Sequence, residues 1–242
     1  MGSEQAGSVP PRGSAGPVRR WLLRVDPANA RESLSHANDG ILTIAGTSLG
    51  LAGAEIGAQT SYTVLAIGAV VGTLSTLSVQ LTEEWNTYEA EQDAVAHEQS
   101  RLLSDPEGEV QELIDWFEAK GVSPVTARQM ASELSDGDAL DIQLALEYGI
   151  QDPMTRRQVI GRTSSAALAF LLGALLPILL QMAAPFDIRS WLTMTIAAVS
   201  LTATALAFSS RGHYRVVFAI VRALCLGLGM LALTYTLGDL LM

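Results

Sequence analysis

Hydrophobic and polar positions occur in long separate blocks along this chain. The stretches 40–82, 164–186 and 190–210 contain a single charged residue, Glu55. A membrane-spanning helix needs about 20 mostly apolar residues, because the hydrocarbon core is about 30 Å thick and a helix rises about 1.5 Å per residue. Five stretches meet this requirement, at 38–59, 62–82, 164–184, 189–209 and 216–241. The pattern therefore predicts an all-α integral membrane protein with five transmembrane helices.

Between the second and third predicted spans, the pattern changes to that of amphipathic helices. The second span is expected to continue as a polar helix to about Leu103. Ser104 to Glu107 has the residues of a capping box with an early proline, so a new helix is expected to begin there. Its apolar residues have the i, i+3, i+4, i+7 spacing of a buried face, at Val110, Leu113, Ile114 and Phe117. Further helix boundaries are expected near Gly121, Ser123, Asp138 and Gly149.

These patterns divide the chain into four parts. Residues 1–32, rich in Gly, Ser and Pro, are expected to form a disordered, juxtamembrane N-terminal segment. Transmembrane helices 1 and 2 are assigned to 33–84, and a cytoplasmic acidic helical domain to 85–160. Transmembrane helices 3 to 5 are assigned to 161–242.

Charge is concentrated in the inserted domain. The chain has 15 basic and 25 acidic residues, and 18 of the acidic residues lie between Glu83 and Asp152. The resulting net charge of −10 favours cations as partners and disfavours nucleic acid. The single cysteine, Cys225, lies in the last apolar stretch, so the sequence offers no disulfide pair, zinc motif or redox motif.

The distribution of Lys and Arg predicts the orientation in the membrane. Thirteen of the 15 basic residues lie before span one, between spans two and three, or between spans four and five. With five spans these segments share one side, which the positive-inside rule assigns to the cytoplasm. The N-terminus and the acidic domain are thus expected inside and the C-terminus outside. The Ala- and Arg-rich composition favours a prokaryotic plasma membrane.

Small residues recur at four-residue spacing in the first two spans. The pairs are Gly46 and Gly50, Gly53 and Gly57, and Gly68 and Gly72. Such pairs either mark close helix contacts or arise by chance, since membrane helices are rich in glycine. An odd number of spans has no internal inverted repeat, so a homodimer is the expected way to build a symmetric pathway.

Carboxylates in the inserted domain are spaced to share helix faces. Glu109 and Glu112 lie three residues apart on one predicted helix, Glu91 and Glu98 lie seven apart on the preceding one, and Glu147 lies on the last. Carboxylates that converge from several helices form iron and manganese sites in helical bundles. The alternative is a solvated acidic surface, and spacing alone does not decide between the two.

Several motifs, in order, resemble the vacuolar iron transporter family over residues 33–242. They are ANDGILT at 37–43, GLAGA at 50–54, GALLP at 173–177 and TYTLG at 234–238. The resemblance implies a proton-coupled exporter of divalent iron or manganese from the cytosol, with an acidic metal-binding domain between spans two and three. It implies no prosthetic group, and it names metal ions, protons, membrane lipid and a second copy of the chain as partners.

The resemblance also implies site residues. Glu98, Glu109, Glu112 and Glu147 match positions where the family places ligand glutamates. Asp39 matches an intramembrane aspartate that binds the ion and a proton. An alternative for this region is that Asn38 or Asp39 caps span one.

The chain departs from the family at several of these positions. Arg101 stands where a further ligand glutamate is expected, and Gln143 and Leu144 replace a methionine pair. Val79 replaces a methionine in span two, and Val71 lies where some members have an acidic residue. Gln80 offers a substitute oxygen on the transport path, and Glu83 and Glu84 either offer further oxygens or, as the preferred interpretation, lie at the cytoplasmic edge.

Two functional hypotheses follow. The first is a homodimeric, proton-coupled metal antiporter that uses Asp39 and Gln80. The second is a membrane-anchored metal-binding or sensing protein that keeps the fold without transport, because the usual span-two ligand is missing. An enzyme is not expected, since no nucleophile or phosphate-binding motif is visible. Arg222, inside span five, either extends to the membrane surface or pairs with an acid such as Asp39 or Glu55.

Overall fold

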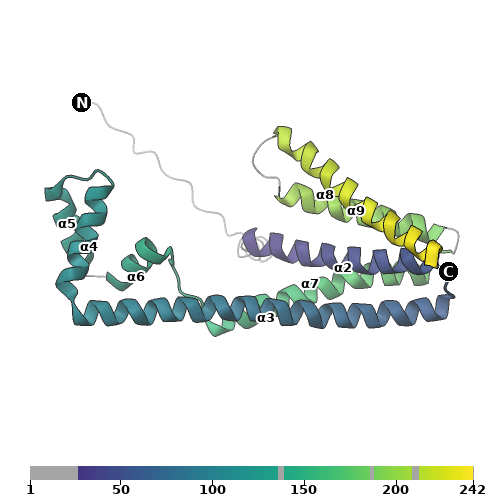
Figure 1. The fold of residues 1–242 in the computed structure, drawn as a ribbon, viewed down its shortest axis with the longest axis horizontal. Helices are drawn as coiled ribbons and strands as arrows, with labels where there is room; N and C mark the ends of the chain where they lie inside the picture. The colour runs from purple at the N-terminus through teal and green to yellow at the C-terminus, as the bar shows by residue number, and fades with distance from the viewer. Residues whose placement is uncertain (1–26, 136–138, 186–187, 209–212, 242) are drawn as a thin grey trace, which may run out of the picture.

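The computed structural model describes residues 27–135, 139–185, 188–208 and 213–241, and these residues are almost entirely helical (Figure 1). The elements are α2 (Pro27–Gly53), α3 (Ala58–Ser104), α4 (Pro106–Ala119), α5 (Pro124–Ser135), α6 (Ala139–Gln143), the π-helical turn η1 (Leu144–Tyr148), α7 (Arg156–Ala183), α8 (Arg189–Phe208) and α9 (His213–Leu241). The described residues contain no strand, as the sequence predicts. Figure 1 shows α3 running the length of the molecule, with α4 and α5 at one end and α8 and α9 at the other.

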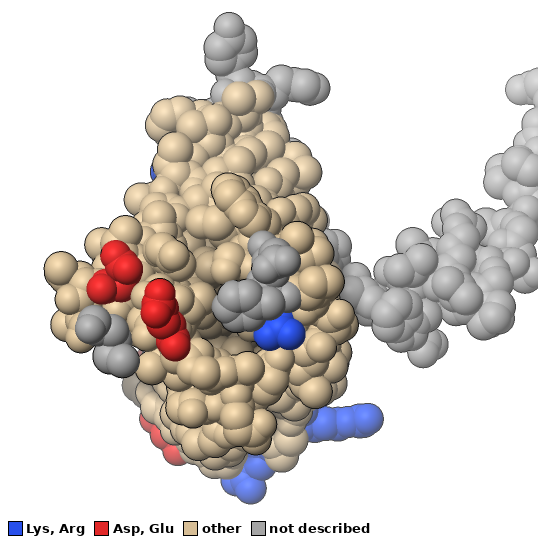
Figure 2. Space-filling model, turned by 90° about the vertical axis from the view of Figure 1, so that its right-hand side faces the viewer, with Lys and Arg blue, Asp and Glu red and all other residues tan. Residues whose placement is uncertain are grey.

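Four described helices are long and apolar enough to cross a membrane. They are α3, α7, α8 and residues Val216–Leu241 of α9. Large apolar side chains on their outer faces are exposed, including Ile67 at 59%, Leu172 at 59% and Phe218 at 69%. Water would penalise so much apolar surface, whereas lipid would not, so these faces are suited to a bilayer. Figure 2 shows that the described surface at the end opposite the inserted domain is mostly uncharged.

The first predicted span falls on α2, which is not among those four helices. Its helix starts at Pro27 and ends at Gly53, so the predicted end at residue 59 is wrong. α2 packs against α7, α9, α8 and α3, and buries Ile44, Ala45 and Leu49 among them. Because other helices cover it, α2 can carry more polar residues than a helix that faces lipid. A total of five spans stays a prediction.

Glycines allow α2 to approach its neighbours closely. A Cβ atom on Gly173 of α7 would collide with the backbone carbonyl of Ala37, and one on Gly53 would collide with that of Tyr235 in α9. The predicted small-residue pairs are therefore only partly used. Gly50 and Gly53 face α9, whereas Gly57 has no neighbour within 4 Å.

The inserted helices form a separate apolar core beyond the bundle. Its buried residues are Leu113, Ile114, Phe117, Ala127 and Ala131. α4 begins after Asp105, whose side chain accepts a hydrogen bond from the Gly108 amide at 3.0 Å. The expected cap at Ser104 is wrong by one residue, because proline at position 106 suits the first helical position after Asp105. Gly121 and Gly149 have φ of +89° and +70° and follow helix ends, as predicted.

Candidate functional site

Asp39 and Asn38 are neighbours on α2 with different surroundings. Asn38 is buried, and its Oδ1 accepts a hydrogen bond from Ser200 Oγ of α8 at 2.8 Å. Asp39 is exposed, and no described residue forms an ion pair or hydrogen bond with its carboxylate. Both lie in the middle of α2, so the alternative that either caps this helix is wrong. Asn38 therefore joins two helices, while the Asp39 carboxylate stays available.

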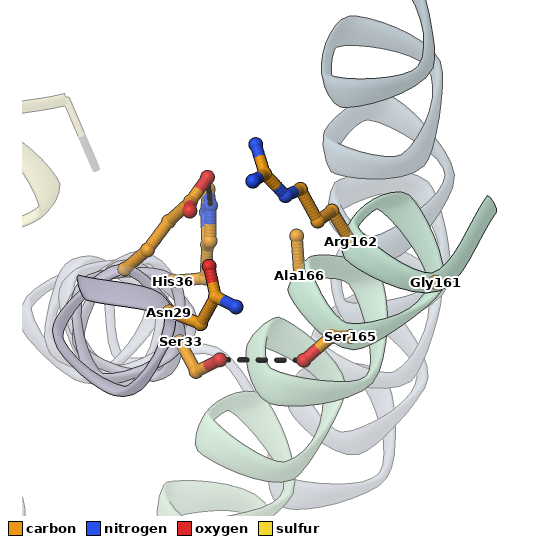
Figure 3. Close-up of a pocket in the computed structure, with 8 residues that line it drawn as sticks. Asn29, Ser33, His36, Gly161, Arg162, Ser165 and Ala166 are labelled. Carbon is orange, nitrogen blue, oxygen red and sulfur yellow. Dashed lines mark hydrogen bonds and ion pairs between the residues drawn. The ribbon is translucent and has the colours of Figure 1, made fainter. Parts of the chain in front are cut away.

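A cavity of about 250 Å³ lies between α2 and α7, near the end of the bundle that faces the inserted domain. Figure 3 shows Arg162 of α7 and His36 of α2 facing this space, and Ser33 hydrogen-bonded to Ser165 at 3.3 Å. His36 Nε2 is buried without a hydrogen-bond partner among the described residues and lies 4.0 Å from Glu32 Oε1. Imidazole and carboxylate groups are metal ligands, but the guanidinium of Arg162, which pairs with Glu84 at 3.4 Å, lines the same cavity.

A second, more open cavity of about 450 Å³ shares Glu32 and His36 with the first. It is lined by Arg31, Glu32, Ser35, His36, Gln80 and Phe208. Gln80, predicted from the sequence, thus shares a cavity with residues of α2. Its amide donates a hydrogen bond to Glu83 at 3.2 Å.

Glu32 and His36 were not predicted as site residues. The signal that could have found them is their spacing on α2, since Glu32, His36 and Asp39 follow the i, i+4, i+7 pattern of one helix face. This pattern is meaningful only once the helix is known to begin at Pro27 and to be covered by its neighbours. The sequence analysis predicted that span one begins at residue 38, so Glu32 and His36 lay before the predicted helix and were not considered as part of its face.

The four predicted ligand glutamates converge, but on an arginine. The guanidinium of Arg101 lies 2.8 Å from Glu109 Oε1, 2.6 Å from Glu112 Oε2, 3.2 Å from Glu147 Oε2 and 3.6 Å from Glu98 Oε2. We call these five residues the Arg101 cluster. Within the described part of the chain, no group of three or more His, Cys, Asp or Glu side chains is arranged to hold a metal ion. The role of the four glutamates as metal ligands remains a prediction.

Glu98 is the most deeply buried member of the Arg101 cluster. It is fully buried on the polar part of α3, beyond the apolar stretch, and neither carboxylate oxygen has a hydrogen-bond partner among the described residues. Burial, with a smaller contribution from the adjacent Glu109 carboxyl, raises the pKa of Glu98 to about 7 against the opposing effect of Arg101. The Glu112 carboxylate, and after it those of Glu109 and Glu98, raise the pKa of the Arg101 guanidinium, which stays charged.

The other residues that depart from the family pattern are either buried in the inserted domain or exposed on α3. Gln143 is buried, and its amide donates hydrogen bonds to the backbone oxygen and the carboxylate of Glu109. Leu144 is fully buried. Val79 and Val71 are 51% and 59% exposed on the outer face of α3. Neither valine is among the residues that line the cavity with Gln80.

Comparison with known proteins agrees with this architecture. The vacuolar iron transporter of Acanthamoeba castellanii is 27% identical over 223 residues, which cover 87% of this chain and 81% of the relative. The family model described as "VIT family" matches residues 30–239. That match begins at the start of α2 and ends in the last turns of α9, so it includes the bundle, the cavities and the inserted domain. This chain therefore belongs to the VIT family.

Proposed function

We propose that this protein transports divalent iron or manganese out of the cytosol in exchange for protons. Membership of the VIT family and similarity to a vacuolar iron transporter support metal transport. The observation that carries the proposal is the carboxylate of Asp39 on α2, with which no residue in the described part of the chain forms an ion pair or hydrogen bond. Asp39 is exposed on that helix, and an exposed charge at the depth of the membrane is costly unless it has a function, because lipid solvates charge poorly.

In this mechanism, Asp39 binds either a metal ion or a proton. A carboxylate in poorly hydrated surroundings has an increased affinity for protons, so a proton on one side of the membrane competes with the metal on the other. Glu32 and His36 stand two turns and one turn before Asp39 on the same helix face. They would receive the ion at the cytoplasmic end, where Gln80 lines the same cavity.

The ligands along this path are oxygen and nitrogen atoms. Val79 provides no thioether, so the path lacks the soft ligand that favours late transition metals. Carboxylate, amide and imidazole groups still suit divalent manganese and iron. We therefore expect manganese to be transported at least as well as iron.

The alternative of a membrane-anchored metal sensor is less well supported by the structure. A sensor that bound metal in the inserted domain would use the four glutamates, and these already contact Arg101. We also propose that the inserted domain faces the cytoplasm and that the protein forms a homodimer. The positive-inside distribution and the odd predicted number of spans support these two assignments.

Transport can be tested in sealed proteoliposomes with an imposed pH gradient. Uptake of ferrous and manganous ions would be compared between the wild type, Asp39→Asn and the control Asp239→Asn, which alters an exposed carboxylate at the far end of α9. We expect gradient-dependent flux in the wild type and the control, and at least a 100-fold loss in Asp39→Asn. Size-exclusion profiles would show that all three proteins are folded. No flux in the wild type, or full flux in Asp39→Asn, would refute the proposal.

A further inference from the structure

We infer that Arg101 is a built-in cation that takes the place of a divalent metal in the inserted domain, so that this domain is held together without metal. The inference does not depend on transport, because it concerns only the Arg101 cluster. It gives the domain a constitutive structural role.

The position of Arg101 supports this inference. One guanidinium contacts carboxylates from three elements: Glu98 on α3, Glu109 and Glu112 on α4, and Glu147 on η1. A guanidinium has five N–H donors in a fixed plane, which is enough to engage several carboxylates at once. Arg101 therefore joins the same elements that a metal ion at this point would join.

Space and charge both oppose simultaneous metal binding. Divalent cations bind carboxylate oxygens at about 2.0–2.6 Å, so an ion shared by these glutamates would need the volume that the guanidinium fills. The guanidinium is also permanently charged, and a second cation at the same place would be repelled. Metal binding would require Arg101 to leave and to give up contacts of 2.6 and 2.8 Å.

Glu98 provides an independent indication that the cluster is built around a cation. Its carboxylate is fully buried, has no hydrogen-bond partner among the described residues, and lies 3.6 Å from Arg101 Nη1. A solvated acidic surface would not bury a carboxylate in this way. The cluster therefore has an interior, and the only cationic group that the described residues place in it is that of Arg101.

The neighbouring residues fit a site without metal. Gln143 donates hydrogen bonds to Glu109 and so occupies a carboxylate oxygen that a metal would otherwise use. Leu144 next to it is fully buried and apolar. Gln143 therefore fixes Glu109 in place through its amide donor, and Leu144 contributes no metal ligand.

Terbium luminescence provides a direct test on the full chain in detergent. Trp116 lines a small cavity with Glu112 and Glu147, so it can sensitise Tb³⁺ bound at the cluster. Titrations would compare the wild type, Arg101→Ala, Arg101→Gln and Arg128→Ala, a control arginine on α5. Mn²⁺ would be added to displace the Tb³⁺.

In the wild type and in Arg128→Ala, we expect no saturable, Mn²⁺-sensitive luminescence of the kind that Glu109→Gln and Glu112→Gln remove, which separates the Arg101 cluster from metal bound on the transport path. Arg101→Ala or Arg101→Gln should gain a site at least tenfold tighter, and adding Glu109→Gln and Glu112→Gln should remove it. A saturable wild-type site that is lost in Glu109→Gln/Glu112→Gln would overturn the inference. So would folded Arg101 variants that bind no more tightly than the wild type. The wild-type titration decides the question even where an Arg101 variant does not fold.

Discussion

The bundle and the inserted domain treat their polar groups in opposite ways. In the bundle, neutral hydrogen bonds fix α2, from Ser200 to Asn38 and between Gln181 and Ser48, and no described residue forms an ion pair or hydrogen bond with the Asp39 carboxylate. In the inserted domain, Arg101 engages every glutamate of the cluster. A carboxylate that already has a fixed cation cannot exchange cargo, so the comparison favours Asp39 as the exchanging group.

The two regions also differ in what brings their helices together. α2 meets α7 and α9 through glycines that allow backbone contact, whereas α4 and α5 meet through a cluster of larger apolar side chains. This difference follows from the solvent. Lipid gives no hydrophobic drive for helices to associate, so close packing must supply the stability, while water favours burial of apolar surface.

The largest effect is expected from a side chain that forces α2 and α7 apart at their closest contact. Gly173→Val should prevent the helices from approaching, because even a Cβ atom collides with the Ala37 backbone, and it should cost more than about 3 kcal/mol. The measurement is the yield of monodisperse protein in detergent. Gly161→Val on the same helix is the control, since no atom lies within 4 Å of its added Cβ. Equal loss in both variants would mean that backbone contact does not hold the bundle.

A smaller effect is expected in the core of the inserted domain. Leu113→Ala should lower the free energy of unfolding of this domain by about 2–5 kcal/mol, because it leaves a cavity among buried residues. Fluorescence of Trp116, in a chain whose other tryptophans are replaced by Phe, would follow unfolding in urea. Val125→Ala, at a position that is 74% exposed, should change stability by less than about 0.5 kcal/mol. If both variants were equally stable, the apolar core would not be the source of stability.

The pH dependence of that domain is expected to reflect Glu98. The pKa of Glu98 rises from 4.5 in the unfolded chain to about 7 in the folded protein. As the pH rises, the unfolded chain therefore loses the Glu98 proton at a lower pH than the folded protein does. The contribution to stability is therefore fully present below pH 4.5 and is lost between pH 4.5 and about 7, by at most about 1.4 kcal/mol per pH unit. Arg101, Glu109 and Glu147 face this group.

Chemical denaturation of the wild type and of Glu98→Gln between pH 5 and 8 would measure this contribution. The neutral amide has no proton to lose, so the decline attributed to Glu98 should be absent in Glu98→Gln. The control Glu118→Gln, on the exposed side of α4, should keep the wild-type profile. Parallel profiles for the wild type and Glu98→Gln would show that the buried carboxyl does not titrate in this range.

The smallest effect is expected next to the proposed exchange site. Asn38→Ala removes the hydrogen bond with Ser200 and should cost about 0.6 kcal/mol, the average for such bonds between membrane helices. Transport should stay within a few-fold of the wild type, in contrast to Asp39→Asn. A double-mutant cycle with Ser200→Ala would isolate the bond. Loss of transport in Asn38→Ala with unchanged stability would move the exchange function to Asn38.

Much of the fold could be predicted from local patterns. The apolar blocks predicted the helices that became α3, α7, α8 and α9, and the turn glycines predicted where the inserted helices end. The cap at Asp105 was missed by one residue, because serine and aspartate are both good caps and proline alone fixes the register. The length of α2 was missed because it is covered by other helices and so lacks a continuous apolar signal.

The sequence by itself determined that the chain has apolar spans, an acidic insert and a resemblance to the VIT family, because hydropathy, charge and motifs are local properties. It also identified Arg101 as a departure from the expected ligands. Only the tertiary structure decided that this arginine lies among the four glutamates, that Asn38 binds α8 while Asp39 does not, and that His36 and Gln80 line one cavity. These are contacts between residues that are distant in sequence, and their geometry depends on how the helices pack.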